Sequence, residues 1–528
     1  MRIALAQYNY TIGDIENNKR LIIDGIHKAK EQKADCVVFA EFAVSGTPAL
    51  DLLGKTTFLE LCEDALEEIA SHTDSITAIV GSPVLESDGS HSAAVVMTDG
   101  KICEVVTKQN LTARREMGFI TNGSGPKILK IAGEYIAVVV GEDFSSLQHL
   151  SDDVRFILNV NARRYGKGTF SARYETFSNY AKRDLKSIIM INQIGGSGEI
   201  VYDGTSSVIT QEGHATLIMK SFEEDFAVYN TDACNEPIEV PEQIFIHDRA
   251  KMNFDAAVLG LRDYYHKNGY QKALVGLSGG IDSSIVTCIA VEALGKENVR
   301  TLTLPSQFTP EQSVADAVNL ASTLGIRYDV IPINEAYSSI IGSMTPVIGA
   351  TEFDLTEENI QARIRTTMLM ALQNKTGYML LNCSNKSENA LGLCTLYGDT
   401  AGAFSPTGDL YKTEMYEMAS HINRRFNNII PESILLKAPS SELSPNQKDT
   451  DLFPSYEIVD AILIRMIEQS QHREEIINAG FDSQIVEKIH SLLMQNEKKR
   501  FQFPPVLRLS SRAFRHELLM PLINKYSY

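Results

Sequence analysis

Residues 273–284 read Ala273-Leu274-Val275-Gly276-Leu277-Ser278-Gly279-Gly280-Ile281-Asp282-Ser283-Ser284. An apolar run that passes directly into glycines predicts a buried β-strand ending in a tight turn, and the apolar residues up to Leu294 predict a helix after it. Glycine lets backbone N–H groups approach an oxyanion closely, and the helix N-terminus adds a favourable dipole. The segment therefore predicts an anion-binding loop between a strand and a helix.

The same pattern continues outward from this loop. Further strands are predicted over 299–304 and 328–333, and helices over 253–268, 283–294, 311–324 and within 454–495. Alternating strands and helices require right-handed crossovers and favour a doubly wound parallel sheet. Ligands of such a sheet bind at the carboxyl ends of its strands.

The N-terminal part of the chain shows a second α/β pattern. Strands are predicted over 2–7, 36–39, 76–80, 93–98, 135–140, 156–159, 188–191 and 206–209, and helices over 18–32 and 55–72. This pattern predicts a layered α/β domain. A polar stretch with prolines follows, so we predict domains over 1–235 and 251–528 joined by a linker over 236–250. Two domains also suit a length of 528 residues.

Composition limits the classes of partner. Asp and Glu outnumber Lys and Arg by 67 to 49, for a net charge of −18, which argues against nucleic-acid binding. The seven cysteines show no metal-binding spacing and suit a reducing compartment. No signal peptide and no apolar run long enough to cross a membrane is found, so we expect a cytoplasmic protein that does not bind membranes.

Asp282 gives the loop its particular chemistry. No Lys follows the glycines, so the loop is not a Walker A motif, and a carboxylate inside a phosphate loop would repel the ligand unless a cation lay between them. Asp282 therefore implies Mg²⁺. The alternative is an ordinary tight turn in which Asp282 and Ser283 cap the helix.

Residues 278–283 resemble the loop of the ATP pyrophosphatases, and ordered segments across 250–528 are similar to the NAD⁺ synthetase family. These segments lie at 304–306, 357–365, 385–388, 397–399, 439–443, 447–449 and 496–500. The resemblance implies that ATP adenylates the carboxylate of deamido-NAD⁺ with release of pyrophosphate, and that ammonia then displaces AMP to give NAD⁺.

The resemblance also implies a role for each matching residue. ATP would be held by Gly276, Leu277, Ser278, Gly279, Gly280, Ile281, Asp282, Ser283 and Cys383. Mg²⁺ would be bound by Asp282 and Glu388, phosphates neutralised by Lys412 and Lys386, and the acceptor oriented by Asp399. Deamido-NAD⁺ would contact Asn359, Glu388, Leu393, Cys394, Thr395, Leu396 and Lys499.

Three residues of this half leave alternatives open. Cys383 stands where family members commonly carry Thr, and the weaker hydrogen bond of a thiol would cost about 1 kcal/mol, which we do not expect to abolish activity. Arg363 and Arg365 are either surface cations or parts of the site. The resemblance further implies a homo-oligomer.

The N-terminal part resembles the nitrilase family, in the version fused to NAD⁺ synthetase as a glutaminase, which implies an αββα layered fold. The matching segments lie at 37–46, 107–108, 140–143, 159–162, 165–167, 192–196 and 202–204. The family uses a Glu base, a Lys for the oxyanion and a Cys nucleophile. Glu41 and Lys108 occupy the first two positions, but Gly141 occupies the third.

Two further departures accompany Gly141. Residues 109–116 replace the family's aromatic and acidic loop, and Arg163 and Arg164 replace small residues. We interpret Glu41 and Lys108 as a structural ion pair and predict a synthetase that uses free ammonia. One alternative is glutamine hydrolysis, by an unrecognised nucleophile or in a protein whose Gly141 was engineered from Cys. Another is a non-catalytic nucleotide-binding protein.

Overall fold

The structure is a computed structural model that describes residues 1–111, 118–147, 150–166, 169–233, 237, 249–349, 352–445, 447 and 453–524. The chain forms two compact units, Met1–His247 and Asp248–Tyr528. Most of the predicted linker at 236–250 and most of the loop at 109–116 lie outside the described residues, so the linker bounds stay a prediction. In the described part of the chain, no helix is long and apolar enough to cross a membrane.

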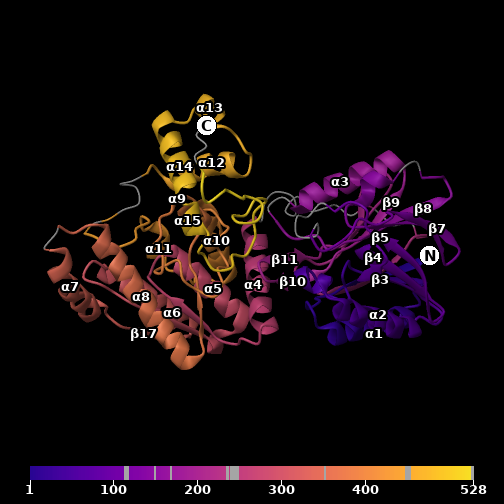
Figure 1. Cartoon of the computed structure of the whole chain (residues 1–528), viewed down its shortest axis with the longest axis horizontal. Helices are drawn as coiled ribbons and strands as arrows, with labels where there is room; N and C mark the ends of the chain where they lie inside the picture. The colour runs from indigo at the N-terminus through magenta and orange to yellow at the C-terminus, as the bar shows by residue number, and fades with distance from the viewer. Residues whose placement is uncertain are drawn as a thin grey trace. The chain divides into compact units, whose positions relative to one another are not determined.

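The first unit stacks two six-stranded sheets between helices, in the order helix, sheet, sheet, helix. One sheet has the order β14-β1-β2-β3-β4-β5 and the other β13-β12-β9-β8-β7-β6. Figure 1 shows α1 and α2 on one side of the strands and α3 on the other. This arrangement confirms the predicted αββα layering.

The bounds of its elements are β1 (Arg2–Gln7), α1 (Ile15–Glu31), β2 (Cys36–Phe39), α2 (Thr56–Ser71), β3 (Thr77–Glu86), β4 (Gly89–Thr98), β5 (Lys101–Thr107), β6 (Lys127–Ile131), β7 (Glu134–Val140), β8 (Val154–Val160), α3 (Thr169–Asp184), β9 (Ser187–Ile191), β10 (Ile194–Ser197), β11 (Ile200–Asp203), β12 (Ser207–Ile209), β13 (Ala215–Ile218) and β14 (Asp225–Asn230). Strands β10 and β11 form a separate hairpin.

Strand β7 shows how the sequence builds these layers. Its alternate residues Ile136, Val138 and Val140 pack between the two sheets, whereas Ala137 and Val139 pack toward α3. Both faces of the strand are therefore buried, which explains its continuous apolar run. Gly141 follows directly at the carboxyl end of this strand.

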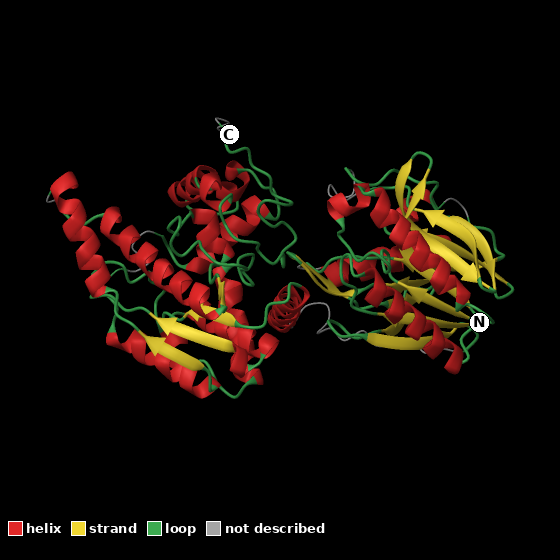
Figure 2. Ribbon diagram, turned by 60° about the horizontal axis from the view of Figure 1, so that its bottom comes forward, coloured by secondary structure: helices red, strands yellow, loops and turns green. Residues whose placement is uncertain are grey.

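The second unit contains a four-stranded parallel sheet with the order β17-β16-β15-β18, which Figure 2 shows in yellow among the helices. Its elements are α4 (Arg249–Lys267), β15 (Ala273–Gly276), α5 (Ile281–Leu294), β16 (Val299–Thr303), α6 (Glu311–Leu324), β17 (Arg327–Val330), α7 (Asn334–Ile348), α8 (Leu355–Thr376), β18 (Met379–Leu381), α9 (Lys386–Leu391), α10 (Lys412–Arg425), α11 (Glu432–Leu436), α12 (Tyr456–Ile467), α13 (Arg473–Asn478), α14 (Ser483–Gln495) and α15 (Glu497–Arg500).

The strand order places the predicted loop at the switch point of this sheet. The chain leaves β15 toward β16 and β17 and later returns to the other side of β15 as β18. A crevice opens where the strand order reverses, at the carboxyl ends of the strands. Residues 277–283, which follow β15, therefore border the crevice in which ligands of this fold bind.

Candidate active site

Hydrogen bonds of its own serine hydroxyl groups fix the conformation of the loop after β15. Ser278 Oγ lies 3.1 Å from Ser283 Oγ and accepts a hydrogen bond from the N–H of Gly280 at 3.2 Å. Gly279 has φ +79°, and a Cβ at this position would lie 2.0 Å from the carbonyl oxygen of Ser313 in α6. Gly279 therefore serves close packing of the loop against α6.

Three charged side chains meet beside this loop, each from the first turn of a helix. Asp282 belongs to α5, Glu388 to α9 and Lys412 to α10. Lys412 Nζ donates to Asp282 Oδ2 at 2.5 Å and to Glu388 Oε1 at 3.2 Å. Asn385, the N-cap of α9, donates to Asp282 Oδ1 at 3.3 Å. The cluster thus carries two carboxylates and one ammonium group.

Lys412 is almost fully buried, with 4% of its side chain exposed, whereas Asp282 and Glu388 keep 18% and 22% exposure. Burial opposes the ammonium charge, but the two carboxylates outweigh it and raise the pKa of Lys412. Lys412 is therefore a permanent cation. Burial and the same carboxylates raise the pKa of the Cys383 thiol, which stays protonated.

The cluster opens on a cavity of about 710 Å³. Its wall comes from the carboxyl ends of β15, β16 and β18, from α8, and from residues 437–443. The predicted residues that line it are Gly276, Leu277, Ser278, Gly280, Ile281, Asp282, Ser283, Asn359, Cys383, Glu388, Leu393, Cys394, Thr395, Asp399, Lys412 and Lys499. Gly279 and Leu396 lie outside this lining, because Gly279 packs on α6 and the carbonyl oxygen of Leu396 binds Arg363 Nε at 3.2 Å.

The wall opposite the loop is fixed by hydrogen bonds between distant segments. Thr395 Oγ1 donates to Asn359 Oδ1 at 2.6 Å, and Lys499 Nζ donates to the carbonyl oxygens of Gly392 and Cys394, each at 2.7 Å. Asp399 accepts from the N–H of Thr395 at 2.6 Å. Desolvation by the surrounding protein raises the pKa of Asp399.

The first unit brings together the three positions of the expected glutaminase site. Glu41 Oε1 accepts from Lys108 Nζ at 3.1 Å and from Ser92 Oγ at 2.7 Å, and all three residues are buried. A Cβ on Gly141 would lie 2.6 Å from Lys108 Cε and 3.4 Å from Glu41 Oε2. Lys108 thus occupies the space into which a side chain at position 141 would project.

Residues that follow Gly141 also tie down the loop after Lys108. Both carboxylate oxygens of Asp143, which is fully buried, accept backbone N–H groups, from Gln109 at 2.6 Å and from Asn110 at 2.7 Å. Arg163 Nη1 lies 3.7 Å from Glu142 Oε1. The start of the altered loop is therefore anchored to the segment that carries Gly141.

Residues 253–503 match the NAD synthase family model. The whole chain is 36% identical to the glutamine-dependent NAD(+) synthetase of Aquifex aeolicus and 35% identical to that of Thermotoga maritima, over 100% of this chain and 100% and 99% of those proteins. The chain belongs to the NAD(+) synthetase family. Membership makes it an enzyme that forms a carbon–nitrogen bond.

Solved structures of family members cover both units. The glutamine-dependent NAD+ synthetase of Acinetobacter baumannii, solved in complex with ADP, aligns with a TM-score of 0.76 at 32% identity over 100% of this chain and 99% of that chain. The enzyme of Cytophaga hutchinsonii aligns with a TM-score of 0.83 at 19% identity, over 99% and 98%, and supports the fold. The predicted two-domain architecture is therefore confirmed.

Within this family member, the structure corrects the expectation for Lys386. Its ammonium group lies in a buried network, 2.7 Å from Glu468 Oε1 and 3.0 Å from Asp409 Oδ1. Burial opposes its charge, but these carboxylates raise its pKa. Lys386 is fully buried and does not line the cavity, so it holds α9 in place and cannot neutralise phosphates.

Sequence reasoning missed a second charged group on the cavity wall. Lys437 Nζ contacts both Glu442 Oε1 and Ser313 Oγ, and Ser313 Oγ donates to Glu442 Oε1 at 2.7 Å. Ser313 also carries the carbonyl oxygen against which Gly279 packs. The block at 439–443 pointed to Glu442, but no spacing in the sequence pairs it with Lys437.

The two arginines with two possible roles, Arg363 and Arg365, differ in their position relative to the cavity. Arg365 lines the cavity and donates from Nε to the carbonyl oxygen of Leu304 at 2.9 Å. Burial lowers its pKa, although the guanidinium stays charged at neutral pH. Arg363 lies outside the lining.

Proposed function

We propose that this chain converts deamido-NAD⁺ to NAD⁺ at the cavity of its second unit, with ATP cleaved to AMP and pyrophosphate. The carboxylate oxygen of deamido-NAD⁺ attacks the α-phosphorus of ATP as the bond to the β-phosphate oxygen breaks. Ammonia then adds to the activated carbonyl carbon, loses a proton, and AMP leaves. The observation that carries the proposal is the Asp282–Lys412–Glu388 cluster beside the loop at 277–283, at the switch point of the sheet.

The residues of the cluster suit the charges of this reaction. ATP would lie on the loop after β15, where the N-terminus of α5 favours its phosphates. Lys412 would stabilise charge that develops on the leaving pyrophosphate. Asp282 and Glu388 offer only oxygen ligands, which suits Mg²⁺, and they already hold one cationic group between them. Mg²⁺ bound there would offset the repulsion between these carboxylates and the phosphates.

The opposite wall would receive deamido-NAD⁺. Asn359, Thr395 and Lys499 are fixed there by hydrogen bonds, so they are oriented before the substrate arrives. Asp399 would help to orient the acceptor carboxylate, and Leu393 and Cys394 would contact the dinucleotide. The cavity volume of about 710 Å³ falls within the usual range of small-molecule binding sites.

The nitrogen source is the finer part of the proposal. Glutamine hydrolysis needs a nucleophile within reach of the base Glu41, and the family position for that thiol is Gly141. Lys108 Nζ would lie 2.8 Å from a Cβ at this position. We therefore propose that free ammonia enters the reaction and that Glu41 and Lys108 form a structural ion pair.

A second candidate is that glutamine still supplies the nitrogen. The relatives from Aquifex aeolicus and Thermotoga maritima are named glutamine-dependent, and they match the whole chain. The hydroxyl group of Ser92 lies 2.7 Å from Glu41 Oε1 and is the group that this candidate would use as nucleophile. Ser92→Ala would then abolish glutamine use without changing the rate with ammonium.

One experiment tests both levels of the proposal. Purified protein would receive ATP, Mg²⁺ and deamido-NAD⁺ with either ammonium or glutamine, and NAD⁺ and glutamate would be measured. We expect NAD⁺ with ammonium and neither product from glutamine. Synthesis from glutamine at a comparable rate would establish the second candidate, and no NAD⁺ from either source with folded protein would refute the synthetase assignment.

A further inference from the structure

The hairpin between β3 and β4 gathers three metal-binding side chains outside both sites described above. Glu86 is the last residue of β3, Asp88 lies in the turn, and His91 is the third residue of β4. Val84 pairs with His91 and Glu86 with Gly89, so Glu86 and His91 project from the same face of the hairpin. A six-residue segment thus supplies one imidazole and two carboxylates.

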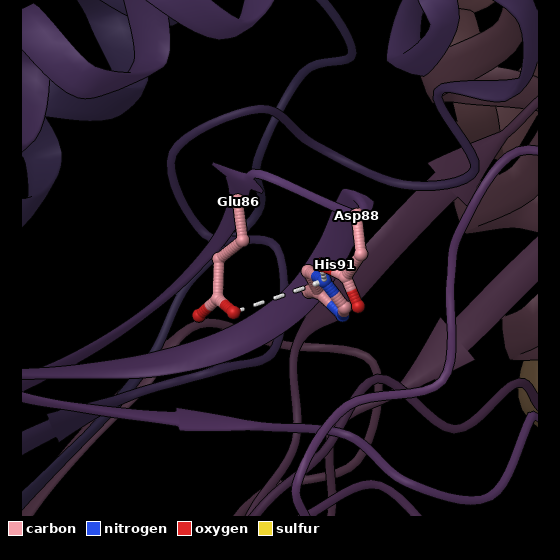
Figure 3. Close-up of side chains that lie close together, drawn as sticks. All are labelled: Glu86, Asp88 and His91. Carbon is pink, nitrogen blue, oxygen red and sulfur yellow. Dashed lines mark hydrogen bonds and ion pairs between the residues drawn. The ribbon is translucent and has the colours of Figure 1, made fainter.

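The donor atoms of these side chains converge. His91 Nε2 lies 2.8 Å from Asp88 Oδ1 and 4.0 Å from Glu86 Oε2. Figure 3 shows both carboxylates beside the imidazole ring. The donor atoms of all three side chains lie within 4.8 Å of one another. Ligands of one tetrahedral zinc ion at about 2.1 Å stand about 3.4 Å apart, so small side-chain rotations would bring these donors to a shared ion.

The environment of His91 separates this cluster from an ordinary patch of surface acids. The imidazole is 99% buried, since 1% of its side chain is exposed, and its Nδ1 has no hydrogen-bond partner in the described part of the chain. Its polar contacts are thus made from Nε2, the atom that faces the two carboxylates. Nε2 is therefore the ring atom that a metal ion held by the two carboxylates would bind.

The charge balance points the same way. Glu86 and Asp88 are 51% and 60% exposed and pair with no Lys or Arg among the residues that the structure describes. Among the described residues, the turn therefore carries two carboxylates beside one imidazole and no Lys or Arg that balances their charge. A divalent cation would supply that balance.

We propose that Glu86, Asp88 and His91 form a binding site for a divalent transition-metal ion, with zinc as the best match. Imidazole nitrogen binds zinc rather than magnesium or calcium. Together with the two carboxylates, the imidazole supplies three of the four ligands of a tetrahedral ion. The ion clips the end of the β3–β4 hairpin, and its role is to stabilise the first unit. Water fills the fourth position.

The test is zinc binding to the full-length protein in the presence of excess Mg²⁺, which keeps Asp282 and Glu388 occupied. The test variant is Glu86→Gln/Asp88→Asn, whose exposed side chains allow it to fold. The matched control is Asp99→Asn/Glu104→Gln, which makes the same charge change at the next hairpin, between β4 and β5. Zinc stoichiometry, affinity and the metal-dependent shift in Tm would be measured for all three proteins.

We expect the wild type and the control to bind one zinc ion that the test variant binds at least about tenfold more weakly. We also expect zinc to raise Tm in these two proteins alone, and X-ray absorption to show nitrogen and oxygen ligands. Equal stoichiometry and affinity in all three proteins, or sulfur ligands, would overturn the proposal. So would the absence of tight zinc binding to the wild type, because the His91–Asp88 contact would then be a hydrogen bond only.

Discussion

Lys412 Nζ lies 2.5 Å from Asp282 Oδ2, although 130 positions separate the two residues in the chain. The first turns of α10 and α5 meet at this contact, directly beside the loop after β15. The contact pairs the Asp282 carboxylate, to which we assign Mg²⁺ binding, with the permanently charged ammonium group of Lys412. Several consequences for activity and stability can be measured.

Replacement of Asp282 should abolish synthesis without unfolding the protein. Asp282→Asn keeps the size of the side chain but removes the charge that we assign to Mg²⁺ binding. We expect NAD⁺ formation with ammonium to fall by about 10²-fold or more. The matched control is Glu297→Gln, which removes an exposed carboxylate just beyond the other end of α5. Activity of Asp282→Asn within twofold of the control would contradict the assignment.

Replacement by Met should lower mainly the stability of the protein at Lys386 and mainly its kcat at Lys412. Lys386→Met leaves the carboxylates of Asp409 and Glu468 without their cationic partner, so we expect a loss of about 3–5 kcal/mol in stability. Lys412→Met leaves carboxylates that water or Mg²⁺ can reach, so the main effect should be on kcat. Thermal unfolding and NAD⁺ formation measured on both variants would separate the roles, and a larger loss of Tm in Lys412→Met would contradict them.

A side chain at position 141 should be unfavourable for two separate reasons. Gly141 has φ +58°, a conformation that costs an L-residue about 1–2 kcal/mol, and Lys108 fills the adjacent space. Gly133 offers a matched control, because it has φ +89° and no atom within 4 Å of an added Cβ. Gly141→Ala should therefore lower the urea midpoint of the first unit more than Gly133→Ala does.

If these two variants lose equal stability, Lys108 moves aside at little cost. The space beside Glu41 would then accept a side chain, and Gly141→Cys would become a realistic route to glutamine hydrolysis. We expect the opposite: Gly141→Cys should release no glutamate from glutamine, because the thiol would displace Lys108 from Glu41. Glutamate release at a rate comparable to NAD⁺ synthesis would contradict this prediction.

Asp460 should make stability depend on pH. Its buried carboxylate accepts bonds from Ser387 Oγ at 2.5 Å and from the N–H of Thr413 at 2.8 Å, but burial raises its pKa to about 6. The folded state therefore binds this proton more tightly than the unfolded state. Protonation of Asp460 thus stabilises the folded state fully below about pH 4, and this stabilisation is lost as pH rises through 6. Urea unfolding between pH 4 and 7 should show that the contribution of Asp460 to the free energy of unfolding falls as pH rises in the wild type. The same profile of Asp460→Asn should lack this fall. Parallel profiles would contradict it.

Local sequence was sufficient for most of the fold. Helix α6 has the bounds predicted for it, and the strand predicted before the glycine loop is present as β15, which ends at Gly276. These features depend on apolar periodicity and on glycine, which act over a few neighbouring residues. Strands β5, β10, β11 and β18 were missed, although the short strands β2 and β12 were predicted, so strand length alone does not decide which strands the local sequence reveals.

The candidate site was predictable only in part. The loop at 278–283 predicted where an anion would bind, but it did not reveal that Gly279 packs closely against Ser313 of α6. Lys386 and Lys412 are similar in sequence terms, since each begins a helix, yet they have different surroundings. The partnership of Lys437 with Glu442 and Ser313 depends on contacts between α6 and the segment after α11.

The sequence by itself determined that the chain has a glycine-rich strand–turn–helix in its second half and no thiol at position 141, because both are properties of neighbouring residues. Only the tertiary structure decided which lysine faces the cavity and that Lys108 fills the space beside Gly141. Those outcomes depend on how separate helices and strands meet, and the burial of each charge then selects its partner. Side-chain surroundings of this kind join residues from 24 to 130 positions apart in the chain, which no local pattern records.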